Sequence, residues 1–197
     1  MANHEPSVGK LARALILLCV WLTLCVATMA GQTAEGIDLD GKRVDPLKTA
    51  LGKPAILIFV RTDCPISNRY APTLQQLENE FAGRVAFWLV YPDKDESSAK
   101  IRKHLQEYGY AIPALQDPGR ELVKISQAQI TPEVAVFGAK GQLAYHGRID
   151  NWYESIGRAR AAPTTHELRD AVRELLAGKA PKVASARAVG CSITDLQ

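Results

Sequence analysis

Hydrophobic and polar positions along the chain follow two repeating patterns, one typical of strands and one typical of helices. Continuous apolar runs over residues 55–60 and 85–90 predict central strands that are covered on both faces of a sheet. Between these runs, residues 65–81 place large side chains at helical spacings, namely Tyr70, Leu74, Leu77 and Phe81. This stripe predicts one helix that packs a single face on the sheet.

The chain continues this alternation of strands and helices up to residue 176. We expect a hairpin over residues 37–44, helices over 97–108, 120–125 and 165–176, and strands over 134–137 and 143–149. Ser97 is suited to cap the first of these helices, and Gly141 to form the turn between the last two strands. Strands separated by helices and followed by a terminal hairpin and helix predict a three-layer α/β domain.

Composition narrows the class of protein without changing this architecture. Of 197 residues, 47% are hydrophobic and 23% are charged, which is typical of a globular chain that folds into a single domain with a hydrophobic core. The formal net charge is +3 and no block of lysines and arginines occurs in the folded part, so we expect no nucleic-acid partner.

The first thirty residues have the features of an export signal. Lys10 and Arg13 precede an uncharged stretch over residues 14–30, and we expect cleavage after Ala30. An uncleaved anchor is the alternative, because this stretch approaches the length of a membrane span. In both cases the folded part is exported, to the periplasm or another compartment outside the cytoplasmic membrane where disulfides persist.

Export leaves two cysteines in the mature chain, since Cys19 and Cys25 belong to the signal. Cys64 follows the first central strand and opens a helix, where unpaired N–H groups and the helix dipole favour the reactive thiolate. Pro65 fits the first helical turn, because that position needs no N–H donor. Cys191 lies near the C-terminus, so the two cysteines either pair with each other or work alone. In the plainer interpretation, Cys64 is a small buried hydrophobic residue.

Four short segments give the chain a family resemblance: Asp40-Gly41-Lys42, Lys53-Pro54, Cys64-Pro65-Ile66-Ser67 and Ile130-Thr131-Pro132-Glu133-Val134. With these segments the chain resembles the thioredoxin superfamily, and within it the extracytoplasmic redoxins of the alkyl hydroperoxide reductase and thiol-specific antioxidant type. The resemblance implies a thioredoxin-like α/β domain over residues 31–178, with a mixed central sheet and an N-terminal hairpin extension. It also implies that Cys64 is reactive and that a cis Pro132 packs against it.

The chain departs from the family's two best-known active sites. Ser67 replaces the second cysteine of a Cys-x-x-Cys pair, so a disulfide across one helical turn is impossible. Peroxiredoxins place a threonine three residues before their reactive cysteine, whereas Thr62 lies two residues before Cys64. Turnover therefore needs another thiol, and Cys191 is the only internal candidate.

The residues after 178 are predicted to form a small, polar, flexible tail, 179–197, that carries Cys191. An extended tail of this length can cross a domain of this size, so we expect Cys191 to fold back and pair with Cys64. The alternative is a loose tail in which Cys191 pairs with another molecule or stays free.

Polar neighbours are expected to line the site, among them Thr62 and Thr131. Arg69 either stabilises the thiolate or is a solvated surface residue, and Asp63 opposes thiolate formation if it lies close. The polar and aromatic run over residues 148–153 forms either a site rim or a structural ion pair.

Three functions follow from these residues. The first is a thiol oxidoreductase that uses Cys64 and Cys191 on protein disulfides or small peroxides, with an external thiol as reductant and no cofactor. The second is a copper-binding chaperone like the Sco-type proteins, with a distant histidine, His104, His146 or His166, as the further ligand. His104 lies beside Lys103 on a helix and is expected to be solvated. The third is a non-catalytic redoxin that binds a partner.

Overall fold

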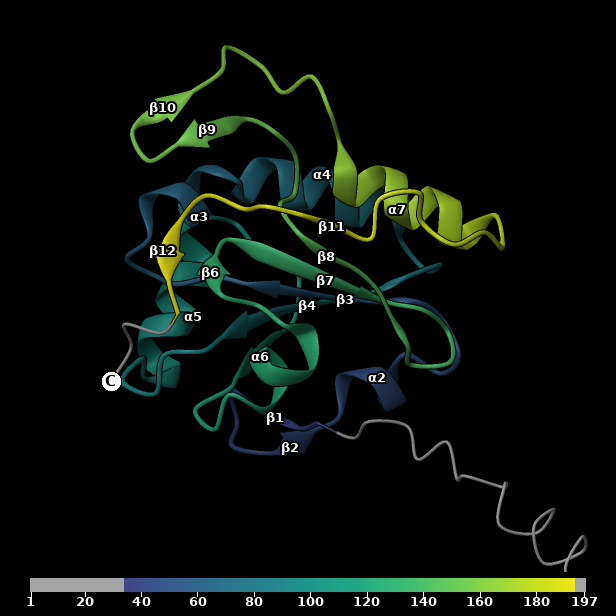
Figure 1. The fold of residues 1–197 in the computed structure, drawn as a ribbon. Helices are drawn as coiled ribbons and strands as arrows, with labels where there is room; N and C mark the ends of the chain where they lie inside the picture. The colour runs from purple at the N-terminus through teal and green to yellow at the C-terminus, as the bar shows by residue number, and fades with distance from the viewer. Residues whose placement is uncertain (1–33, 194–197) are drawn as a thin grey trace, which may run out of the picture. The chain divides into compact units, whose positions relative to one another are not determined.

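A mixed eight-stranded sheet organises the computed structural model, which describes residues 34–193 (Figure 1). The strand order is β11-β8-β7-β3-β4-β5-β1-β2. The strands of this sheet are β1 (Gly36–Asp38), β2 (Arg43–Val44), β3 (Ala55–Phe59), β4 (Ala86–Tyr91), β5 (Ala114–Gln116), β7 (Glu133–Phe137), β8 (Leu143–Gly147) and β11 (Ser185–Ala186). Two further pairs lie outside it: β9 (Tyr153–Ser155) with β10 (Arg158–Ala159), and β6 (Ile130–Thr131) with β12 (Cys191–Ser192).

The central strand β3 explains why its sequence is apolar without interruption. It pairs in parallel with β4 and antiparallel with β7, and all five of its residues are buried. Side chains alternate between the two faces of a strand. Ile56 and Ile58 belong to the core on one face, and Leu57 and Phe59 to the core on the other. Both faces are therefore covered, as expected.

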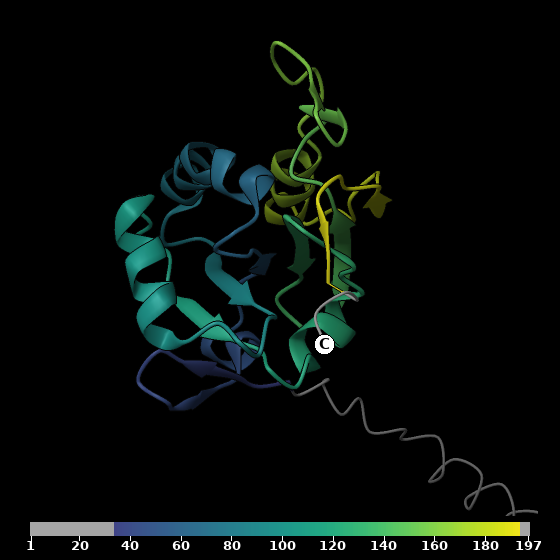
Figure 2. The ribbon, with the colours of Figure 1, turned by 90° about the vertical axis from the view of Figure 1, so that its left-hand side faces the viewer.

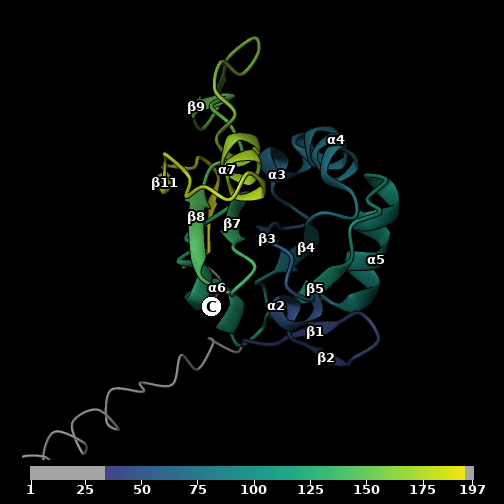
Figure 3. The same cartoon turned by 90° about the vertical axis from the view of Figure 1, so that its right-hand side faces the viewer.

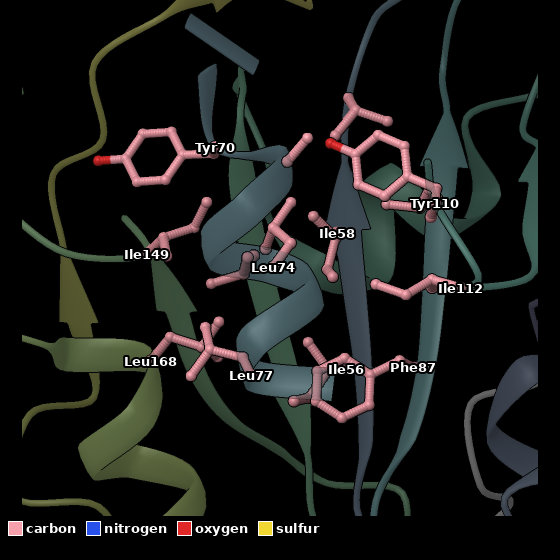
Figure 4. Packing of buried hydrophobic residues seen from close by; sticks show 14 of the residues in the cluster. Ile56, Ile58, Tyr70, Leu74, Leu77, Phe87, Tyr110, Ile112, Ile149 and Leu168 are labelled. Atoms are coloured by element: carbon pink, nitrogen blue, oxygen red, sulfur yellow. The ribbon is translucent and has the colours of Figure 1, made fainter. Parts of the chain in front are cut away.

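Helices cover both faces of the sheet and form the two outer layers. On one face lie α4 (Ala71–Phe81), α5 (Ser98–Glu107) and α7 (Glu167–Leu176), and on the other α2 (Pro46–Thr49) and α6 (Glu121–Ser126) (Figures 2 and 3). In the larger core, Leu74 and Leu77 of α4 lie over Ile56 and Ile58 of β3, with Leu168 of α7 beside them (Figure 4). Each buried side chain of this size contributes about 1.5–3 kcal/mol relative to exposure. The three-layer α/β prediction is confirmed.

The helix expected over residues 65–81 is in fact two helices. The first, α3 (Pro65–Arg69), has Tyr70 as its C-cap, and α4 starts at the residue after this cap. Pro72 in the first turn of α4 has no N–H to donate back to Asn68, and its ring disfavours a continuous helix there. The apolar stripe survives the break, because Tyr70 and the three α4 residues that follow it in the stripe are all buried.

Most other elements match their predicted positions within a few residues, including the β1–β2 hairpin and the cap of α5 by Ser97. The β5 strand and the β9–β10 hairpin were not predicted. Three residues in β5 give too little pattern to identify a strand, and the outward side chains of the hairpin have no apolar alternation. The hairpin turns at Ile156-Gly157, where Gly157 has a φ of 78°.

The C-terminal tail, residues 179–193, is docked along the domain rather than loose. Its strand β11 pairs in parallel with β8, and its strand β12 pairs antiparallel with β6. At Gly147 an added Cβ would lie 2.0 Å from the Ala186 carbonyl oxygen, so the two backbones approach closely. Backbone pairing and two buried side chains, Ala188 and Ile193, hold this tail, and they are too few to give a periodic hydrophobic pattern.

The export signal or anchor expected over residues 14–30 lies outside the described residues. Within residues 34–193, no helix has the length and hydrophobicity to cross a bilayer.

Candidate active site

Cys64 stands where the chain leaves β3 and enters α3. Its backbone is extended, with φ −87° and ψ 109°, and its carbonyl accepts the N–H of Asn68 at 3.0 Å as the first helical bond. Pro65 occupies the first turn, as predicted. The Cys64 side chain is fully buried.

Two groups contact the Cys64 sulfur from segments far away in the sequence. The Cys191 thiol donates to Cys64 Sγ across 2.9 Å, and the Cys64 thiol donates to the Thr131 carbonyl at 3.2 Å. Both cysteines are free thiols. The β12–β6 pairing produces this arrangement, since it places Cys191 directly opposite Thr131. The structure therefore brings together the two cysteines that the sequence singled out.

The Thr131–Pro132 bond is cis, as the family resemblance implies. The tail crosses this segment at Gly190, where an added Cβ would lie 2.0 Å from the Thr131 carbonyl oxygen. Glu133 fixes the approach to the segment, because its carboxylate accepts the N–H groups of Gln129 and Ile130 at 2.7 and 3.1 Å. Only a residue without a side chain fits between the tail and Thr131.

The two thiols have opposite pKa shifts. Burial raises the pKa of Cys64, but hydrogen bonds from Cys191 and from the side chain and N–H of Ser67 outweigh it, so the net pKa is lowered from 9.0. Burial raises the pKa of Cys191, and its hydrogen bond to Cys64 and the charge of that residue raise it further, to about 12. Cys64 is therefore the thiol that ionises first.

Ser67 takes part in this site although it replaces a cysteine. Its side chain is fully buried, and its hydroxyl has no hydrogen-bond partner among residues 34–193. A hydroxyl is both donor and acceptor and can rotate toward a thiolate. Ser67 therefore stabilises the charged form of Cys64 and cannot form a disulfide with it.

The Thr62 side chain is engaged elsewhere. Its hydroxyl donates to the Glu96 carboxylate in a very short hydrogen bond, and its N–H donates to the same oxygen at 2.9 Å. Glu96 is buried and also pairs with Lys100 at 3.5 Å. Thr62 thus anchors the loop before Cys64 to the start of α5.

The two charged neighbours, Asp63 and Arg69, each have partners of their own. Asp63 is exposed and forms an ion pair with Arg61 at 3.0 Å. Arg69 lies over the rings of Trp152 and Tyr153, with its guanidinium carbon 5.1 and 5.9 Å from their centroids. Neither residue is among the main causes of the pKa shift of Cys64, although the charge of Asp63 helps to raise the pKa of Cys191.

A buried hydrogen-bond chain behind the site was missed at the sequence level, and the prediction that His104 is solvated is wrong. Tyr91 donates its hydroxyl to His104 Nδ1 at 2.8 Å, so Nε2 carries the proton and donates to the Asn68 side-chain oxygen at 2.9 Å. Asn68 in turn donates to the Thr62 carbonyl at 3.0 Å. Burial lowers the pKa of His104, which keeps the ring neutral. No local pattern marks this chain, because it forms only when α5 packs beside α3.

The run over residues 148–153 is both structural and part of the site rim. Arg148 forms an ion pair with Glu167, and buried Asp150 accepts the Tyr70 hydroxyl at 2.6 Å. Tyr153 faces a groove of about 290 Å³ beside the thiols. We call this the cysteine groove; the residues that line it are Pro65, Ile66, Arg69, Tyr153, Ile156, Gly157, Ala159, Gly190 and Cys191.

The potential metal ligands do not converge. Among residues 34–193, no three His, Cys, Asp or Glu side chains come together in a group that could hold a metal ion. His104 has both ring nitrogens engaged in hydrogen bonds, and His146 faces Glu133 at 3.9 Å.

Comparison with known proteins adds a family match and structural likenesses. Residues 28–146 match the AhpC/TSA family. A search of curated proteins finds no match. Among solved structures, an uncharacterized conserved protein from Geobacillus kaustophilus is 23% identical, with a TM-score of 0.71 over 83% of this chain and 88% of that one. A hypothetical protein from Sinorhizobium meliloti 1021 is 21% identical, with a TM-score of 0.70 over 83% and 91%.

A more distant likeness, at 18% identity, is to a secreted disulfide oxidoreductase of Mycobacterium tuberculosis that is homologous to E. coli DsbE. Its TM-score is 0.52, over 77% of this chain and 99% of that one. At these identities the solved structures establish the thioredoxin-like fold alone.

Proposed function

The chain belongs to the AhpC/TSA family, and from this premise we propose that it is a thiol–disulfide oxidoreductase with Cys64 as nucleophile and Cys191 as resolving thiol. The observation that carries the proposal is the 2.9 Å contact between the two sulfurs. A disulfide bond is about 2.05 Å long, so a small shift of the side chains brings the sulfurs to bonding distance.

In the first step the Cys64 thiolate attacks one sulfur of a substrate disulfide. A mixed disulfide forms, and the other substrate sulfur leaves as a thiolate that takes up a proton. Cys191 and Ser67 prepare this step in the closed state, because their hydrogen bonds lower the pKa of Cys64 against the effect of its burial. Because Cys64 is fully buried, the docked tail must open before the substrate reaches the sulfur.

In the second step Cys191 attacks the Cys64 sulfur. It releases its proton, forms the Cys64–Cys191 disulfide and expels the second substrate sulfur, so one protein dithiol and one substrate disulfide exchange two electrons and two protons. Burial and the charged neighbour Cys64 raise the pKa of Cys191 to about 12 in the free dithiol. Once Cys64 is in a mixed disulfide that charge is gone, so Cys191 becomes easier to deprotonate when it is needed.

The choice of a disulfide over a peroxide rests on Thr62. A threonine that assists peroxide cleavage needs a free hydroxyl at the sulfur, whereas Thr62 donates its hydroxyl to Glu96. An external thiol then reduces the Cys64–Cys191 disulfide and completes the cycle.

We place this chemistry outside the cytoplasmic membrane, with residues 14–30 as a cleaved signal or an anchor. Support comes from the uncharged stretch itself and from the likeness to a secreted disulfide oxidoreductase. Cell fractionation of the full chain, and of a chain without residues 1–30, tests the location. Recovery of both in the cytoplasm would contradict it.

Stopped-flow reaction of the reduced protein with a neutral model disulfide and with hydrogen peroxide tests the chemistry. We expect the wild-type protein to form an intramolecular disulfide, Cys191→Ser to stop at a mixed disulfide visible by mass spectrometry, and Cys64→Ser to be inactive. The proposal fails if Cys64→Ser keeps its reactivity. Preference for peroxide over the disulfide would restore the peroxidase alternative.

A further inference from the structure

A second cleft opens beside the cysteine groove and has a strongly cationic wall. It has a volume of about 920 Å³ and runs between the β9–β10 hairpin and the tail. We call it the arginine cleft; four arginines line it, Arg148, Arg158, Arg160 and Arg187. It shares Tyr153, Ile156 and Gly190 with the cysteine groove, so the two hollows are continuous.

The positive charge of this surface is only partly balanced. Glu154 is the one acidic residue among those that line either hollow, and it pairs with both Arg158 and Arg160. Arg69 and Arg187 have no carboxylate partner within residues 34–193. At least three positive charges along these two hollows are therefore uncompensated.

The same surface carries apolar area that nothing in the described chain covers. Ile156 at the hairpin turn is 77% exposed, and it is one of three large hydrophobic residues with high exposure within residues 34–193. The hairpin projects past α4 and α7 (Figure 1). Exposed apolar area surrounded by charge is typical of a surface that binds a protein.

We infer that the cysteine groove and the arginine cleft together form a docking surface for an acidic segment of a protein partner, which delivers its disulfide to Cys64. This inference rests on the proposed function and adds the partner's chemistry. The partner's carboxylates face Arg69, Arg158 and Arg187, and an apolar side chain beside its cysteine enters the cysteine groove next to Ile156. Charge complementarity of this kind accelerates encounter more than it adds affinity.

Two synthetic disulfide peptides of equal length test the docking surface. They share their cysteines and apolar residues and differ only in flanking glutamates or lysines. With the reduced protein in low salt, about 20 mM, we expect the acidic peptide to react about tenfold faster than the basic one. The ratio should fall toward one in about 0.5 M salt, where charges are screened within a few ångströms.

The variant Arg158→Gln/Arg187→Gln removes two of the charges without leaving an acid unpaired, because Glu154 keeps Arg160. Each rate of this variant is normalised to its rate with a neutral small disulfide. The ratio of the rate with the acidic peptide to the rate with the basic peptide should then drop severalfold. The matched control Lys42→Gln/Lys140→Gln removes two exposed charges on the β1–β2 and β7–β8 turns and should keep the wild-type ratio.

The possible outcomes distinguish a failure of the docking surface from a failure of the proposed function. Equal rates for the two peptides at low salt, with normal reaction of the neutral disulfide, would overturn the docking surface and leave the oxidoreductase intact. No reaction with any disulfide would overturn the proposed function itself. Oxidised glutathione is a small anionic disulfide. If its reaction is accelerated at low salt as much as that of the acidic peptide, the inference of a protein partner is wrong and a small molecule is the substrate.

Discussion

At the scale of single residues, the contact between the two thiols determines which of them carries charge. Two thiolates 2.9 Å apart would repel strongly in a buried site. Cys64 therefore loses its proton before Cys191 does, and the proton that remains is held on Cys191 and donated to Cys64. Opposite pKa shifts on chemically identical groups arise from position alone, because one sulfur accepts hydrogen bonds and the other supplies one.

Replacing Cys191 tests this arrangement. Cys191→Ala removes the donor, and a hydrogen bond to a charged group contributes about 1.5–3 kcal/mol, so we expect the pKa of Cys64 to rise by about one to two units. Cys191→Ser keeps a donor and should raise that pKa less. The measurement is the ultraviolet absorbance of the thiolate as a function of pH. A lower Cys64 pKa in Cys191→Ala would contradict the arrangement.

The reciprocal variant addresses the other thiol. Cys64→Ala removes both the hydrogen-bond acceptor and the charge that help burial to raise the pKa of Cys191 to about 12. The pKa of Cys191 should therefore fall toward 9.0 in the same titration. A pKa that stays near 12 would mean that burial alone sets it.

At the scale of elements, the active-site loop is positioned by contacts that cross from one element to another. The side chains of α5 and of the residue before its cap hold the loop through Glu96 and His104, and β6 and β12 bring Cys191 to the sulfur. Each of these contacts joins segments that are far apart in the sequence. The site therefore forms only when the sheet, α3 and α5 are in place.

The histidine chain has a pH signature. Burial lowers the pKa of His104 below its ordinary value of 6.5, so below that pH the unfolded chain binds a proton that the folded protein does not. Stability is then lost as the pH falls through the window below 6.5. His104→Phe should weaken this pH dependence and also lower the free energy of unfolding at pH 7 by about 1–3 kcal/mol, because Tyr91 and Asn68 lose their partner.

Urea unfolding of the reduced protein between about pH 5 and pH 7 measures both effects, since in this range histidine titrates. His166→Phe is the control, because its side chain makes no capping hydrogen bond at α7. If wild-type and His104→Phe lose the same stability on acidification, another group causes the loss.

The close crossing at Gly190 gives a steric prediction. In Gly190→Ala the new methyl group meets the Thr131 carbonyl oxygen, so the β12 strand must move away from β6. We expect formation of the Cys64–Cys191 disulfide to slow by about tenfold or more, since a displacement of about 1 Å has effects of that order or larger. Gly119→Ala is a matched control, because its methyl group meets only Glu121 at 3.9 Å. Mass spectrometry after timed oxidation and alkylation measures the rate, and an unchanged rate in Gly190→Ala would mean that the tail reaches Cys64 by another path.

How far the sequence predicted these features depends on the kind of contact. The apolar run of β3 and the stripe on α4 are visible because burial against a sheet imposes a period on the sequence. Cys64 was recognised because its chemistry follows from a local position at a helix start. The docked tail, buried Glu96 and the His104 chain escaped prediction, because backbone pairing and distant packing leave no periodic trace.

At the scale of the whole molecule, the Cys64–Cys191 bond would close a loop of 127 positions and join the end of the domain to its central strand. A cross-link of this span stabilises by about 4–5 kcal/mol, chiefly by restricting the unfolded chain. We expect the oxidised protein to exceed the reduced protein in free energy of unfolding by about this amount, measured by urea unfolding with Cys191→Ser as the uncrosslinked reference. An oxidised form less stable than the reduced form would mean that the docked tail does not accommodate the bond.

The two-point attachment of the tail has a consequence for solubility. Strand β11 covers the outer edge of β8, where the carbonyls of Ala184 and Ala186 accept the N–H groups of His146 and Arg148. An uncovered strand edge invites pairing with another chain and hence aggregation. Cys191 lies beyond β11, so the β12 end can lift to admit a partner while β11 continues to shield the sheet. In the proposed cycle, the reactive end thus opens while the edge of β8 stays covered against self-association.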